Sequence, residues 1–176
     1  MRSEQVSPVK SHAYQLGWWM VFLSAAVILA ALAFEYVGQY EPCPLCLVQR
    51  YAYYAGVPLL FVSLILLSAE KAKMAALVFF VVSLAFLANS GLGVYQAGAE
   101  YGFWPGPQSC SGGEALNASA DSLLADLQKT KVPRCDEPEF WFLGLSFAGW
   151  NALISFVIFV GTLKAAFACV EQRETL

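Results

Sequence analysis

Residues 74–99 read MAALVFFVVSLAFLANSGLGVYQAGA, and no charged residue interrupts them. A helix that crosses a bilayer needs about 20 consecutive, mainly apolar residues, so this stretch is long enough to span a membrane. Three further charge-free stretches share this character, at residues 14–34, 51–69 and 140–163. The pattern predicts an all-α membrane protein, a bundle of four transmembrane helices at about 14–34, 47–69, 74–97 and 141–163.

The composition of the 176-residue chain supports this prediction. Hydrophobic residues make up 59% and charged residues 13%, and the mean hydropathy is +0.57. Soluble domains contain about 25% charged residues, so a free cytosolic enzyme is excluded. The net charge of −3 has the wrong sign for a protein that binds nucleic acid. We expect a single integral membrane domain over residues 1–176.

The segments between the predicted spans are unequal in length. A short cysteine-bearing loop follows the first span, a tight turn at residues 70–73 follows the second, and a long outer loop covers about 98–140. Four spans place both termini and the turn on one side of the membrane. That side carries Arg2, Lys10, Lys71, Lys73, Lys164 and Arg173, against Arg50, Lys129, Lys131 and Arg134 on the other. The positive-inside rule therefore favours cytoplasmic termini.

The five cysteines agree with this orientation. Cys43, Cys46, Cys110 and Cys135 lie in or beside the outer loops, whereas Cys169 is expected past the last span on the inside. An even number of cysteines outside and a lone thiol inside is typical of an oxidising outer compartment.

The motif Cys43-Pro44-Leu45-Cys46 is the strongest candidate for chemistry. A zinc site usually needs four nitrogen or sulfur ligands, and the single histidine, His12, is expected on the opposite side. Redox chemistry is therefore favoured over metal binding. Pro44 suits the first turn of a helix, so Cys43 should cap the second span and Cys46 should lie in its first turn. The partial positive charge of a helix N-terminus favours the reactive thiolate.

Arg50 and the pair Cys110 and Cys135 each allow two interpretations. Arg50 lies four residues after Cys46, on the same helix face, where it either reaches a lipid phosphate or serves as a fixed cation beside a reactive sulfur. Cys110 and Cys135 either form a structural disulfide or exchange with another protein's thiol. The Pro105-Gly106-Pro107 segment and Gly112-Gly113 flank Cys110 and would leave such a bond accessible.

Taken in order, these features resemble the DsbB family, the bacterial disulfide bond formation protein B. The resemblance rests on the four spans, the CxxC at the entrance of the second, Arg50, and the loop pair Cys110 and Cys135. Residues 135–146, CDEPEFWFLGLS, also resemble the family's junction between the loop and the fourth helix. Some members carry a histidine near the outer end of the third helix, whereas residues 95–98 here read YQAG.

The resemblance implies roles for these residues. Cys43–Cys46 and Cys110–Cys135 would be two redox-active disulfides. Cys46 would face a quinone, either ubiquinone or menaquinone, with Arg50 as its electrostatic partner. Cys110 would form a mixed disulfide with a DsbA-type thiol oxidase of thioredoxin fold, and Cys135 would resolve it through Cys43.

The resemblance also implies an enzyme of the bacterial inner membrane. It would be a multi-pass thiol:quinone oxidoreductase, with cytoplasmic termini and periplasmic cysteine loops, and it would sustain disulfide formation. A vitamin K epoxide reductase-like enzyme is an alternative, although its CxxC follows the loop cysteines instead of preceding them. A non-enzymatic four-helix scaffold with a disulfide-closed loop is the other alternative, but it has no use for a CxxC above Arg50.

Overall fold

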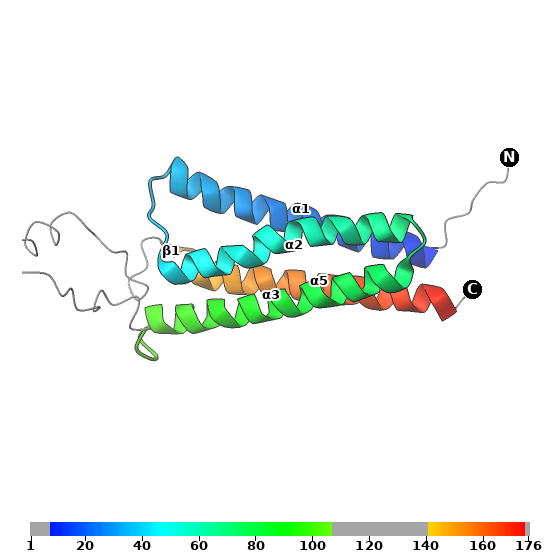
Figure 1. Cartoon of the computed structure of the whole chain (residues 1–176). Helices are drawn as coiled ribbons and strands as arrows, with labels where there is room; N and C mark the ends of the chain where they lie inside the picture. The colour runs from blue at the N-terminus through cyan, green and yellow to red at the C-terminus, as the bar shows by residue number, and fades with distance from the viewer. Residues whose placement is uncertain (1–7, 107–140, 175–176) are drawn as a thin grey trace, which may run out of the picture.

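Four long helices make up most of the protein. The computed structural model describes residues 8–106 and 141–174, and the helices are α1 (Pro8–Tyr36), α2 (Pro44–Ser68), α3 (Ala72–Glu100) and α5 (Phe147–Glu174). They lie side by side along one long axis (Figure 1). Each helix is long and apolar enough to cross a membrane. The predicted four-helix membrane bundle is therefore confirmed.

The connections between the first three helices are short. The chain leaves α2 and enters α3 through a turn in which Glu70 has a positive φ of 61°. The backbone N–H of Lys71 donates to the carbonyl oxygen of Leu66 over 2.9 Å, which satisfies one of the free carbonyls at the end of α2. This turn lies at the same end of the bundle as the two termini, and the α1–α2 loop lies at the opposite end (Figure 1).

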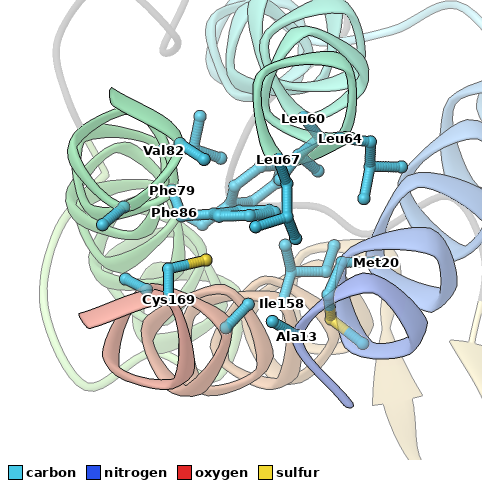
Figure 2. Packing of buried hydrophobic residues seen from close by; sticks show 14 of the residues in the cluster. Ala13, Met20, Leu60, Leu64, Leu67, Phe79, Val82, Phe86, Ile158 and Cys169 are labelled. Atoms are coloured by element: carbon cyan, nitrogen blue, oxygen red, sulfur yellow. The ribbon is translucent and has the colours of Figure 1, made fainter. Parts of the chain in front are cut away.

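Large apolar side chains fill the centre of the bundle. Leu60 of α2, Phe79 and Phe86 of α3, and Ile158 of α5 are completely buried and belong to one cluster (Figure 2). Cys169 belongs to the same cluster, because α5 continues to Glu174 and carries this residue into the core. Cys169, expected past the last span, thus lies within α5, and its place on the inner side of the membrane stays a prediction.

The chain enters α5 through a β-hairpin. Strand β1 (Trp141–Phe142) pairs antiparallel with strand β2 (Leu145–Ser146), and the two residues between them, Leu143 and Gly144, have φ values of 51° and 79°. Two successive positive φ angles suit a tight hairpin turn and are incompatible with a right-handed helix. The predicted start of the fourth helix at residue 141 was therefore wrong, and α5 begins at Phe147.

Helices α3 and α5 approach one another closely at Gly93. A Cβ atom at this position would lie 3.0 Å from the backbone nitrogen and from the Cα of Ala152, which belong to the rigid backbone of α5. We expect Gly93→Val to lower the free energy of unfolding by about 1–3 kcal/mol, the usual cost of overpacking. Gly91→Val is the matched control, because nothing lies within 4 Å of a Cβ at that exposed position.

Thermal unfolding of the purified protein in detergent measures the effect. Equal midpoints for the Gly93→Val and Gly91→Val variants would contradict the close contact between α3 and α5.

Candidate active site at the outer end of helix α2

The candidate active site begins at the first turn of α2. Cys43 is the N-cap residue, with an extended backbone (φ −66°, ψ 159°), and Pro44 follows it in the first turn. The backbone N–H of Cys46 donates to the sulfur of Cys43 over 3.2 Å, so the Cys43 side chain takes the place of the usual capping oxygen. The predicted cap at Cys43 and the position of Cys46 in the first turn are both confirmed.

The two sulfur atoms of the motif are adjacent. They lie 2.6 Å apart, and the sulfur of Cys43 is the donor in the contact with the sulfur of Cys46. Donating this hydrogen bond raises the pKa of the Cys43 thiol above its usual value, and burial raises it further. Cys43 is therefore the protonated partner of the pair, and Cys46 accepts its hydrogen bond. The disulfide between them stays a prediction.

A groove of about 260 Å³ lies beside Cys46, between α1, α2 and α5. Its walls are mostly apolar, and they include Val27, Ile28, Ala31 and Phe34 of α1 together with Phe147 and Ile154 of α5. Its polar lining comprises Cys46, Gln49, Arg50 and Asn151, together with Glu35, Tyr40 and Tyr53. Cys46 is the one sulfur that lines this groove among the described residues. A sulfur atom of the CxxC motif therefore lies in the wall of a mainly apolar groove.

Arg50 is one of the polar residues that line the groove. Its Nη1 donates to Oε2 of Glu35, near the end of α1, and the two side chains are 14% and 25% exposed. A side chain this buried and paired with a carboxylate is not extended toward a lipid phosphate. Its position favours the second interpretation of Arg50, a fixed cation on the same groove as Cys46. Its role toward a quinone stays a prediction.

A chain of side-chain amides lies behind the sulfurs. Nε2 of Gln96 on α3 lies 3.4 Å from the sulfur of Cys43 and 3.3 Å from that of Cys46. Oε1 of Gln96 accepts a hydrogen bond from Gln49 on α2 over 2.7 Å, and Gln49 accepts one from Asn151 on α5. The cysteine pair is therefore connected by hydrogen bonds to three helices.

Sequence reasoning assigned no role to three of these residues. Gln96 drew notice only for the absence of a histidine, and Gln49 and Glu35 drew none. Their shared signal is a polar side chain within a long helix that crosses a membrane, where such groups need partners. Polar residues deeper in the bundle also form hydrogen bonds between helices: Nδ2 of Asn89 on α3 donates to Ser155 on α5 over 2.9 Å.

The second predicted pair, Cys110 and Cys135, lies outside the described residues. Their pairing and their exchange with a partner stay predictions.

The fold and the site together define a class: a multi-pass membrane protein with a CxxC at the mouth of a transmembrane helix. The family model described as "Disulfide bond formation protein DsbB" matches residues 14–165. The chain therefore belongs to the DsbB family, whose members are membrane proteins of disulfide bond formation. The protein is accordingly a disulfide-forming oxidoreductase with several membrane-spanning helices.

Individual relatives agree with the family. Disulfide bond formation protein B of Hahella chejuensis is 32% identical over 175 residues, which cover 88% of this chain and 93% of the relative. The protein of the same name from Nitrosococcus oceani is 31% identical over 148 residues, 81% of this chain and 83% of the relative. An uncharacterised protein of Rickettsia prowazekii is 22% identical over 163 residues, 90% and 92% of the two chains. No solved structure gives a significant match.

Proposed function

We propose that this protein is a thiol:quinone oxidoreductase that reoxidises a DsbA-type dithiol protein and passes the electrons to a membrane quinone. The observation that carries the proposal is the shared groove: Cys46 of the CxxC motif and the cation of Arg50 line one cavity whose remaining wall is mainly apolar. A reactive thiol, a fixed positive charge and an apolar channel are what a lipid-soluble electron acceptor requires.

The groove suits a quinone in its shape and chemistry. Ligand sites are mostly apolar clefts with a few placed polar groups, and this groove has that composition. Arg50 and Asn151 offer N–H donors there, and Phe34 and Ile154 belong to the apolar wall. When bound, a quinone supplies an acceptor for two electrons and two protons. Ubiquinone and menaquinone share this chemistry, and both are candidates.

The cysteines divide the work between two pairs. Cys110 forms the mixed disulfide with the partner, and Cys135 resolves it, so that the partner leaves oxidised and the loop pair is reduced. Exchange with Cys43–Cys46 then passes two electrons to the CxxC pair and restores the Cys110–Cys135 bond. Closing the Cys43–Cys46 disulfide releases the two electrons and two protons that reduce the quinone.

The energetics of exchange require such a final acceptor. DsbA is strongly oxidising, with a potential near −120 mV, whereas structural disulfides lie below about −300 mV. Transferring two electrons from DsbA to a disulfide at about −300 mV costs about 8 kcal/mol, at 1.4 kcal/mol per 30 mV. A quinone that takes the electrons away offsets this cost. The helix terminus at Cys46 and the charge of Arg50 favour the thiolate that starts the last step.

We place the protein in the bacterial inner membrane with the CxxC facing the periplasm. Cys43 caps the N-terminus of helix α2 at one end of the bundle. The basic α2–α3 turn lies at the other end, with the start of α1 and the end of α5 (Figure 1). The lysines of this turn, Lys71 and Lys73, favour the cytoplasmic side.

An anaerobic assay of the purified protein tests the proposal. Reduced DsbA-type protein is mixed with catalytic amounts of the enzyme and with either a ubiquinone or a menaquinone analogue. We expect one quinone to be reduced for each DsbA disulfide formed, followed by the loss of quinone absorbance and of free thiols. Omitting the enzyme is the control. Oxidation of DsbA without consumption of either quinone would overturn the proposal.

A further inference from the structure

The amide chain behind the cysteines is oriented along its whole length. Nδ2 of Asn89 donates to the hydroxyl of Ser155 over 2.9 Å, and the hydroxyl of Tyr53, which lies 3.1 Å from Ser155, donates to Oδ1 of Asn151 over 2.7 Å. Nδ2 of Asn151 donates to Oε1 of Gln49, and Nε2 of Gln49 donates to Oε1 of Gln96 over 2.7 Å. The amides of Asn151, Gln49 and Gln96 thus each accept from the core side and donate toward the sulfurs.

The two ends of the chain determine this direction. A primary amide has two N–H groups and one oxygen, so Gln96 presents either donors or an acceptor to its neighbours. Its Nε2 donates over 3.1 Å to Oε1 of Glu100, a carboxyl oxygen whose lone pairs accept this hydrogen bond. At the other end, Oδ1 of Asn151 accepts from the hydroxyl of Tyr53, which leaves the N–H groups of Asn151 to donate to Gln49. Rotating the Gln96 amide would place its oxygen against Glu100 and both sulfurs.

The last amide of the chain lies between groups that carry or develop negative charge. One N–H of Gln96 serves Glu100, which leaves the other for the two sulfurs at 3.4 and 3.3 Å. A donor that points at a thiolate stabilises it, because hydrogen bonding to the charged form favours that form. Gln96 is itself buried, so no water competes strongly for this position.

We propose that Gln96 is a positioning residue that stabilises the reduced, thiolate form of Cys46, and that Gln49 and Asn151 hold its amide with the donors toward the sulfur. The inference rests on the proposed redox role of the CxxC pair. It differs from the proposed function of Arg50, because Gln96 approaches the pair from α3, whereas Arg50 lines the groove between α1, α2 and α5. Among the described residues, the charged and titratable groups around Cys46 are Cys43 and Glu100, and Glu35, Tyr40, Arg50 and Tyr53, which line the same groove.

The rate of Cys46 alkylation against pH tests the inference without a quinone or a partner protein. The reduced full-length chain in detergent is treated with iodoacetamide, and peptide mass spectrometry follows the modification of Cys46 alone. We expect Gln96→Leu to raise the apparent pKa of Cys46 by about one unit and to slow alkylation at neutral pH about tenfold. Gln96→Glu keeps the shape of the side chain but replaces the N–H donors by an acceptor with negative charge. The pKa of Cys46 should therefore rise further in this variant than in Gln96→Leu.

A second variant tests whether the chain acts through Gln96. Gln49→Leu removes the bond that holds the Gln96 amide and should raise the pKa of Cys46 by a smaller amount. The same change should have no effect in a Gln96→Leu background. Ser90→Ala is the matched control, because it removes another polar contact between α3 and α5, to the carbonyl of Ala152, outside the chain. It should leave the alkylation profile unchanged.

The redox equilibrium gives an independent measurement. Stabilising the thiolate stabilises the reduced form, which makes the disulfide a stronger oxidant. Gln96→Leu should therefore shift the equilibrium of the CxxC pair with glutathione about tenfold toward the disulfide, or about 30 mV. An alkylation profile of Gln96→Glu like that of the wild type would overturn the inference, as would an additive effect of Gln49→Leu and Gln96→Leu. Neither result would bear on quinone reduction, so the proposed function would stand.

Discussion

Cys46→Ala is expected to reduce the rate of quinone reduction to the uncatalysed background, because this substitution removes the one sulfur that lines the groove among the described residues. Capture of a DsbA-type partner as a mixed disulfide should survive, since we propose that Cys110 carries out that step. Cys110→Ala should give no captured partner and, because the electrons come from that partner, no quinone reduction either. Non-reducing electrophoresis follows the captured species, and the loss of quinone absorbance follows the last step.

Cys169→Ala is the matched control for these cysteine changes. It removes a thiol that is buried in the core and does not line the groove, so turnover should remain close to that of the wild type. Normal quinone reduction by Cys46→Ala would place the electron-donating sulfur elsewhere. Normal oxidation of the partner by Cys110→Ala would reduce the loop pair to a structural role.

Arg50→Met should raise the apparent KM for quinone and lower kcat, with a combined loss of about 10²-fold in kcat/KM. Removing one preorganised electrostatic donor from an active site typically costs about 10²–10³-fold. Arg50→Lys keeps the charge but loses the planar donor fork, so it should retain about a tenth of the activity. Steady-state kinetics with varied quinone measure both constants, and partner capture by Cys110 should be unaffected.

The ion pair of Arg50 with Glu35 requires a further control. Arg50→Met alone leaves a partly buried carboxylate without its partner, which destabilises the site for reasons unrelated to quinone. The double variant Arg50→Met with Glu35→Gln removes that unpaired charge. If Arg50 acts on the quinone, the double variant should remain as slow as the single one. Recovery of wild-type kcat/KM by the double variant would make Arg50 a structural partner of Glu35.

Much of the fold follows from the sequence because the bilayer imposes a simple rule. A spanning helix must satisfy its backbone internally and be apolar over about 20 residues, so the charge-free stretches mark the helices directly. The same holds for the start of α2, where Pro44 and its neighbours specify a helix N-terminus that Cys43 caps. These features depend on residues close together in the chain.

The start of α5 depended on backbone geometry that composition does not reveal. Residues 141–146 are apolar enough to continue a helix, yet Leu143 and Gly144 adopt positive φ angles and form a hairpin turn. The hydroxyl of Tyr101 donates to the carbonyl of Gly144 over 2.8 Å, which ties this turn to the residue that follows α3. Such a contact joins segments that are far apart in sequence.

The candidate site also combines features set by residues close together in the chain with features set by tertiary contacts. The sequence by itself determined the CxxC motif, the cap at Cys43 and the position of Arg50 one turn beyond Cys46, because these are local properties of one helix. Only the tertiary structure decided that Arg50 pairs with Glu35 and that Gln96 reaches both sulfurs. Those partners come from α1 and α3, and packing of the helices brings them together at distances that residue spacing along the chain does not encode.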